Sequence, residues 1–149
     1  MSLEANKAII RKMIEAINKQ NLASLDQLIA TDFVYYMPMQ QIQGLAIMKQ
    51  GIEEEIHSFP DLHVTIEDII AEGDKVCVRL KETATHTGEF RGLAPTNKKL
   101  TYTAVTIWRI VKGKVVEGWG VYDQMDFYKE LGVYEYTEKG KKLFPEDVK

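Results

Sequence analysis

The sequence has 149 residues, of which 45% are hydrophobic and 28% charged, and its formal net charge is −3. This size suits one globular domain with room for a core and one pocket, and the lack of a Lys or Arg cluster argues against a nucleic-acid partner. The single cysteine, Cys77, excludes an internal disulfide, and no apolar run approaches the roughly 20 residues of a membrane span. Because the first residues also lack the apolar segment of a signal peptide, we expect a cytoplasmic protein that binds neither nucleic acid nor membrane.

The first third of the chain predicts helices around one short strand. Residues 6–18 carry Ile10, Met13 and Ile17 at helical spacing, which predicts an amphipathic helix. The three glutamates at 53–55 are interpreted as the solvated face of a later helix. The other expected elements are a short helix at 22–30, a strand at 32–37, a loop at 40–44 and a helix at 45–57.

From residue 61 onward the apolar pattern repeats at every second residue, which predicts strands. In residues 75–87 the even-numbered positions from Val76 to His86 form a mostly apolar row. The odd-numbered positions form a polar row that is expected to face solvent. The expected strands cover residues 61–71, 75–87, 100–111 and 115–121, with a loop at 88–99, a turn at 112–114, a helix at 124–131 and a polar tail at 134–149.

This order of elements predicts an α+β fold. Helices come first and a meander of strands follows, so a curved antiparallel or mixed sheet should pack on three amino-terminal helices. Such a sheet encloses a cone-shaped space, and ligand pockets favour the mouth of such a space. We therefore expect one domain over residues 1–149, with a core of about 5–133.

Asp123 is the first candidate for chemistry. Counting by twos along the last strand places it in a mostly apolar row with Val115, Trp119 and Val121. A dehydrated carboxylate in such a row has a raised pKa and can exchange protons near neutral pH. The alternative is that Asp123 caps the helix at 124–131. The sequence leaves both readings open.

His86 is the second candidate, because it ends an apolar row just before the loop at 88–99. An imidazole there can orient a substrate carbonyl or relay a proton, whereas the alternative is a core histidine bonded to a neighbour such as Glu82. No metal-ligand spacing, phosphate-binding loop or nucleophile elbow is present, so neither a metal nor another cofactor is expected. Bulky side chains that fit either a pocket wall or an ordinary core are Tyr35, Met37, Met48, Phe90, Tyr102, Trp108 and Trp119.

Several short patterns lie between His86 and Gly132. They are H-x-G-x-F-x-G-x-x-P-T from His86, R-x-x-x-G-K-[IV]-x-E from Arg109, E-x-W-x-x-x-D ending at Asp123, and a closing L-G. With the amino-terminal helix pair, they resemble the SnoaL-like polyketide cyclases of the nuclear-transport-factor-2-like superfamily, which share the ketosteroid-isomerase-like fold.

The resemblance implies a cone-shaped α+β barrel, cystatin-like in its sheet, with a deep pocket, no cofactor and a dimer formed through the outer face of the sheet. It also implies that Asp123 is the acid–base in an intramolecular aldol closure of a polyketide ester. Two positions depart from the family pattern. Gly118 stands where His is frequent, and Asn97 stands where Gly is usual, a left-handed position that Asn tolerates.

The leading hypothesis is a cofactor-independent cyclase, isomerase or lyase that uses Asp123 on a small hydrophobic carbonyl compound. His86, Tyr35 or Tyr102 would then donate a hydrogen bond to the enolate oxygen. The alternatives are a non-catalytic small-ligand-binding domain and a dimerisation domain of the same fold. We also expect a homodimer, because an outer sheet face that bears apolar residues needs cover.

Overall fold

The computed structural model describes residues 2–38, 40–143 and 145. Its helices are α1 (Leu3–Asn18), α2 (Leu25–Leu28), α3 (Leu45–Ser58), α4 (Gln124–Leu131) and α5 (Glu138–Leu143), with one 3₁₀ turn, η1 (Leu22–Ser24). Its strands are β1 (Ile29–Met37), β2 (Gln40–Gln43), β3 (His63–Glu72), β4 (Lys75–Thr85), β5 (Lys99–Val111) and β6 (Lys114–Tyr122). Most of the predicted elements are confirmed to within a few residues.

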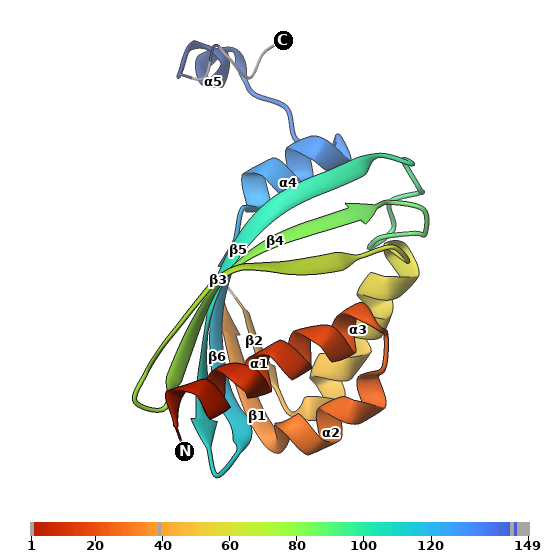
Figure 1. The fold of residues 1–149 in the computed structure, drawn as a ribbon. Coiled ribbons are helices and arrows are strands. Elements are labelled where there is room, and N and C mark those ends of the chain that lie inside the picture. Colours follow the sequence, from red (N-terminus) through yellow and green to blue (C-terminus); the bar gives the residue numbers. More distant parts are fainter. Residues whose placement is uncertain (1, 39, 144, 146–149) are drawn as a thin grey trace.

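The six strands form one curved sheet in the order β2-β1-β6-β5-β4-β3. The pairing of β1 with β6 is parallel and all the other pairings are antiparallel, so the sheet is mixed. Figure 1 shows α1, α2 and α3 together below the curve of the sheet, and α4 at its far end. The predicted α+β class, a cone-shaped sheet on three amino-terminal helices, is confirmed.

Two local predictions in the first third are wrong. The helix expected over 22–30 ends at Leu28, because Ile29 is already extended and begins β1. The loop expected at 40–44 is the strand β2, which folds back on β1 and pairs Ile42 with Tyr35. Both segments are short, so tertiary pairing decides their conformation over local propensity.

The alternation predicted for the long strands is confirmed. Even-numbered residues of β4 and β5 face the helices and are mostly buried, whereas odd-numbered residues are mostly exposed. The buried side chains form two clusters. One, around Phe33 and Trp108, packs on α1 and α3, and the other, around Phe59 and Phe127, packs under α4. Tyr122 contacts both clusters.

Strand β6 contains a bulge that changes which residues face inward. Val115 pairs with Ile110 but Glu117 already pairs with Arg109, so one extra residue lies between them. A one-residue insertion moves every following side chain to the opposite face. Beyond the bulge, Gly118 and Gly120 are therefore buried, while Val121 is exposed.

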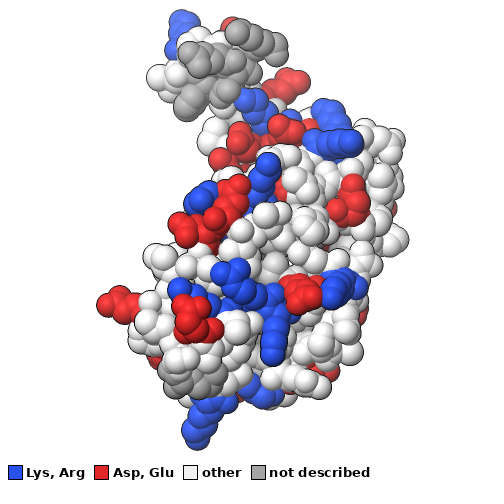
Figure 2. Space-filling view, viewed as in Figure 1, with Lys and Arg blue, Asp and Glu red and all other residues white. Residues whose placement is uncertain are grey.

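Charged side chains of both signs are distributed over the surface. On the face shown in Figure 2, basic and acidic side chains lie next to one another. Within the described residues, no helix has the length and apolar character needed to cross a bilayer. Part of the predicted polar tail forms α5, and residues 144 and 146–149 of that tail lie outside the described residues.

Candidate functional site

Glu82 and Tyr102 form the centre of the candidate site. They lie directly opposite each other on β4 and β5, on the inward rows of both strands. Burial raises the pKa of Glu82, and its interaction with the Tyr102 hydroxyl partly opposes that increase. A carboxyl group among apolar neighbours thus lies beside a phenol.

Glu55 is a second carboxyl group that faces the same space. It lies near the end of α3 and is only partly exposed, whereas Glu53 and Glu54 are exposed. Burial, and to a smaller extent the charge of Glu82, raise the pKa of Glu55, and the charge of Arg91 opposes this increase, so that the resulting pKa is about 7. Near neutral pH this carboxyl group can therefore both accept and donate a proton.

Tyr35 reaches the site from β1. Its ring stacks on Trp108 at a centroid distance of 5.1 Å, and it lies over two glycines of β6. A β-carbon on Gly120 would stand 1.8 Å from the Tyr35 hydroxyl oxygen, and one on Gly118 would stand 2.6 Å from the rings of Tyr35 and Trp108. The glycines therefore make room for Tyr35, which occupies the space beside Gly118 and Gly120.

Both tyrosines remain hydrogen-bond donors. Burial raises the pKa of Tyr35 and of Tyr102 far above the ordinary value, and the charges of Glu82 and Glu55 raise both further. We call Glu55, Glu82, Tyr35 and Tyr102 the carboxyl–tyrosine cluster. It combines a proton-exchanging acid with neutral O–H donors, the two kinds of group that enolate chemistry needs.

An aromatic wall adjoins this cluster at the α4 end. The Phe127 ring lies 5.1 Å from Tyr102, 6.0 Å from Tyr122 and 5.7 Å from Phe90, measured between centroids. Burial raises the pKa of Tyr122, and its interaction with the neighbouring Tyr128 raises it further. The wall is suited to contact with a flat or apolar ligand.

Asp123 does not face this interior, so the placement predicted for it is wrong. Its side chain is exposed and caps α4, with Oδ1 accepting a hydrogen bond from the Asp126 amide at 3.0 Å. The reason is the bulge in β6, which turns the row of Trp119 and Val121 outward. The capping alternative describes its position, and its catalytic role stays a prediction from the family resemblance.

Replacement of Asp123 separates these two roles. Asp123→Asn is expected to keep the free energy of unfolding within about 0.5 kcal/mol of wild type, because Asn also caps helices, whereas Asp123→Ala should cost about 1 kcal/mol. Urea unfolding at neutral pH measures both values. Turnover abolished in a fully folded Asp123→Asn protein would instead show that this carboxylate takes part in the reaction.

His86 is fully buried, at 0% exposure, and its partner is Thr96 rather than Glu82. Nδ1 accepts a hydrogen bond from the Thr96 amide at 3.2 Å and lies 3.0 Å from the Thr96 hydroxyl. The amide of His86 bonds to Lys98, and its carbonyl accepts from Asn97. These bonds close the base of the loop between β4 and β5. In this position His86 orders the loop, and its proposed proton transfer stays a prediction.

The other predicted site residues divide into two groups. Tyr35, Tyr102 and Trp108 lie at or beside the carboxyl–tyrosine cluster, and Phe90 belongs to the adjoining wall. Met48 is buried in the core. Trp119 lies on the outer face of the sheet, where it stacks on Tyr36 at 5.8 Å, and Met37 lies at the end of β1. The sheet therefore separates Trp119 from the inward group.

Glu55 was not predicted as a site residue from the sequence, and Glu82 was considered only as a neighbour of His86. The sequence nevertheless contains a pattern that indicates both residues. Glu82 interrupts the apolar row of β4, and Glu55 continues the apolar spacing of Leu45, Met48 and Ile52 along α3. A charged residue inside an apolar row is uncommon unless it is paired or functional.

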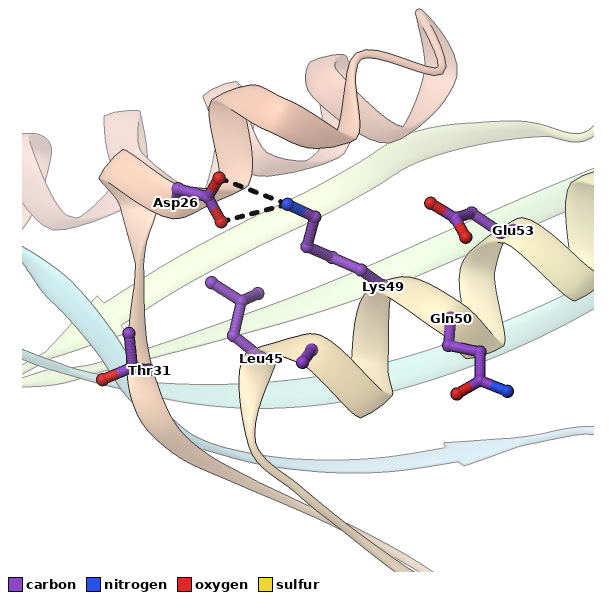
Figure 3. A pocket seen from close by; sticks show the side chains of 7 residues that line it. Asp26, Thr31, Leu45, Lys49, Gln50 and Glu53 are labelled. Atoms are coloured by element: carbon purple, nitrogen blue, oxygen red, sulfur yellow. Dashed lines mark hydrogen bonds and ion pairs between the residues drawn. The ribbon is translucent and has the colours of Figure 1, made fainter.

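A separate hollow of about 420 Å³ lies outside the cone. Figure 3 shows it between α2, β1 and the first turns of α3, with the ion pair of Lys49 and Asp26 crossing it at 3.0 Å. No member of the carboxyl–tyrosine cluster and none of the predicted site residues lines this hollow. It therefore contributes nothing to the candidate site.

The fold and the inward polar groups define a cone-shaped α+β protein of the kind that encloses small molecules. Residues 7–131 match the SnoaL-like polyketide cyclase family, and this match covers most of the chain. The chain therefore belongs to the SnoaL-like polyketide cyclase family. No curated protein matches it significantly.

Two solved structures show how similar its relatives are. AclR, "a putative hydroxylase from Streptomyces galilaeus", is 34% identical and superposes with a TM-score of 0.82 over 90% of this chain and 100% of its own. IdmH, "a putative polyketide cyclase from Streptomyces antibioticus", is 28% identical, with a TM-score of 0.77 over 86% of this chain and 99% of its own. Both names refer to small-molecule chemistry.

Proposed function

We propose that this protein is a cofactor-independent small-molecule enzyme in which Glu55 is the general acid–base. The arrangement that supports this proposal is the carboxyl–tyrosine cluster, in which Glu82 lies directly opposite Tyr102 on the inward rows of β4 and β5. Glu55 interacts electrostatically with Glu82, Tyr35 and Tyr102, and its pKa is raised to about 7, chiefly by burial. The substrate would be a hydrophobic, polyketide-like carbonyl compound. We further propose that residues 1–149 form one domain and that the protein works in the cytoplasm.

The proposed reaction is an aldol-type ring closure. The Glu55 carboxylate removes a proton from the carbon next to a substrate carbonyl, and the electron pair of that C–H bond forms an enolate. The Tyr35 hydroxyl and the Tyr102–Glu82 pair stabilise the negative oxygen by hydrogen bonding. The enolate carbon then attacks a second carbonyl of the same molecule, a C–C bond forms, and Glu55 returns its proton to the new alkoxide. An isomerase would use the same first step and return the proton to another carbon.

Similarity to AclR favours hydroxylation of a related compound as a second candidate function. Proton removal by Glu55 would again give a carbanion, which would add dissolved O₂ and a proton to form a hydroperoxide. A two-electron reductant from solution would then reduce the hydroperoxide to the alcohol, with the second oxygen atom released as water. A protein that binds such compounds without changing them is the remaining alternative. The two catalytic candidates differ in the mass of their products, and a binding protein gives no product.

The test is a screen of polyketone esters and aromatic polyketide intermediates with product analysis by mass spectrometry. A cyclase or isomerase gives a product of equal mass or one that has lost water, and a hydroxylase gives a product with one added oxygen atom. The variant Glu55→Gln is matched by Glu53→Gln, since the carboxylate of Glu53 is exposed and lines the separate hollow shown in Figure 3. Turnover retained by Glu55→Gln would exclude Glu55 as the acid–base. Binding without turnover in the wild type would favour the non-catalytic function.

We also propose a homodimer formed through the outer face of the sheet. Val105 and Val121 pair across β5 and β6 with 41% and 55% of their surfaces exposed, and Ile107 beside them is 38% exposed. Cys77 lies opposite Ile107 on β4. A continuous apolar surface of this kind is typical of a covered interface.

The predicted dimer can be tested by changing this surface. Val121→Glu is expected to convert a dimer into a 17.1 kDa monomer in sedimentation velocity at micromolar concentration. Ile47→Glu is the control, because Ile47 is also 55% exposed but lies on α3. A wild-type protein that sediments as a monomer, or a Val121→Glu dimer, would contradict the proposal.

A further inference from the structure

The loop between β4 and β5 contains a tight turn with an arginine at its tip. Phe90 and Leu93 exchange two backbone hydrogen bonds, of 3.0 and 2.9 Å, around Arg91 and Gly92. Both central residues have positive φ, 50° for Arg91 and 85° for Gly92, which is the pattern of a type I′ turn. Asn or Gly is favoured at the first central position, so an arginine there is held in a disfavoured conformation.

This turn is fixed against the end of α3 that carries Glu55. The carbonyl of Ser58, one helical turn after Glu55, accepts the amides of Thr87 and Gly88, and its hydroxyl donates to the carbonyl of Glu89 at 2.6 Å. Phe90 then packs into the aromatic wall, 5.3 Å from Phe59 between centroids. The location of the turn relative to Glu55 is therefore set by both backbone bonds and packing.

The guanidinium group of Arg91 lies over the ring of Phe90, 5.2 Å from its centroid. Within the part of the chain that the structure describes, no carboxylate lies within ion-pair distance of it. The positive charge of Arg91 nevertheless affects the site electrostatically. It lowers the pKa of both Glu55 and Tyr122, although burial raises each pKa by more. Arg91 is thus positioned at the site, and none of the described residues supplies a carboxylate that pairs with it.

We propose that Arg91 binds a carboxylate of the substrate and thereby orients the substrate on Glu55. This inference rests on the proposed function, and it narrows the substrate class to carbonyl compounds that carry a carboxylate. A guanidinium group binds a carboxylate through two parallel hydrogen bonds, which fixes orientation as well as position. The neighbouring rings of Phe90 and Phe127 would contact the apolar part of the same molecule.

Binding of a matched pair of probes tests the proposal without any need for turnover. Anthraquinone-2-carboxylate and its methyl ester share the aromatic carbonyl system and differ in charge. Wild type is expected to bind the acid at least about tenfold more tightly than the ester, as a charge-assisted pair implies. Arg91→Gln should remove this preference, and isothermal titration calorimetry measures both dissociation constants.

Lys112→Gln is the matched control. Lys112 and Gly113 also have consecutive positive φ values, 49° and 80°, in the turn between β5 and β6. The variant removes one positive charge from the same kind of turn elsewhere in the fold, and it should keep the preference for the acid. Equal binding of acid and ester by wild type, no binding of the acid, or an unchanged preference in Arg91→Gln would each overturn the proposal.

Arg91→Asn adds a readout that does not depend on any ligand. Asn suits the turn, so this variant should unfold at a higher temperature than wild type while losing the preference for the acid.

The groups that face Glu55 are Glu82 from β4, Tyr35 from β1, Tyr102 from β5 and Arg91 from the loop. Loss of Arg91 should therefore raise the pKa of Glu55, measured by carboxyl ¹³C NMR, and an unchanged Glu55 titration would also overturn the proposal. Failure of the proposed function would appear separately, as turnover retained by Glu55→Gln.

Discussion

Glu55→Gln is expected to reduce turnover by at least about 100-fold, because a positioned acid–base typically contributes a factor of that size or more. The same change should stabilise the folded protein at high pH. Burial raises the pKa of Glu55 from its ordinary value of 4.5 to about 7, so folding favours the protonated form. The wild type is therefore penalised as pH rises from about 4.5 to 7, and the penalty is constant above that range.

The size of this penalty follows from the shift. The rise in the pKa of Glu55 corresponds to a loss of at most about 3 kcal/mol in the free energy of unfolding. Because Glu55 is partly exposed, we expect wild type and Glu55→Gln to differ by only about 1 to 2 kcal/mol in that free energy. Urea unfolding of wild type and Glu55→Gln should agree at pH 4 and differ by that amount at pH 8, with the variant more stable. Glu53→Gln should follow wild type at both values. A wild type that gains stability relative to Glu55→Gln as pH rises would contradict the raised pKa.

Gly88→Ala is expected to destabilise the protein by about 2 to 4 kcal/mol, the range of substitutions that force backbone to move. A β-carbon at Gly88 would stand 2.1 Å from the carbonyl oxygen of His57 and 3.0 Å from the Cα of Ser58. Both contacts are with backbone at the end of α3, so no side-chain rotation relieves them. The loop would have to move away from α3, which would also separate Arg91 from Glu55.

Thermal and urea unfolding measure this effect, and Gly51→Ala is the control. Gly51 is exposed in α3, and a β-carbon there meets nothing within 4 Å. Alanine should therefore stabilise the helix by up to about 1 kcal/mol. The two substitutions are chemically identical and have opposite expected signs. Equal unfolding midpoints for Gly88→Ala and wild type would show that the loop does not need this close approach.

Features that depend on a few neighbouring residues could be predicted from the sequence. The inward row of β4 follows from the pleat of a single strand, and α4 has the predicted bounds because Asp123 and Gly132 stand at its two ends. Both features are decided within about four residues, so local chemistry is sufficient. Asn97 has the left-handed backbone that the family resemblance implied, with φ of 57°.

The place of Glu55 was only partly predictable. Its spacing from Leu45, Met48 and Ile52 put it on the apolar side of α3, but the adjacent Glu53 and Glu54 made a solvated face the simpler interpretation. The rotation of α3 over β1 and β2 decides which of the three glutamates turns inward. That rotation is a result of packing between elements, and a helical pattern with three consecutive acids does not contain it.

Composition and periodicity by themselves determined the α+β class, with an amino-terminal helical layer, a curved sheet and an apolar interior. Only the tertiary structure decided which side chains meet inside. The bulge in β6 turned Asp123 and Trp119 outward, and the parallel pairing of β1 with β6 brought Tyr35 over Gly118 and Gly120. Register and pairing between strands some 80 residues apart in the chain depend on the packing of the whole sheet against its helices, so no local pattern specifies them.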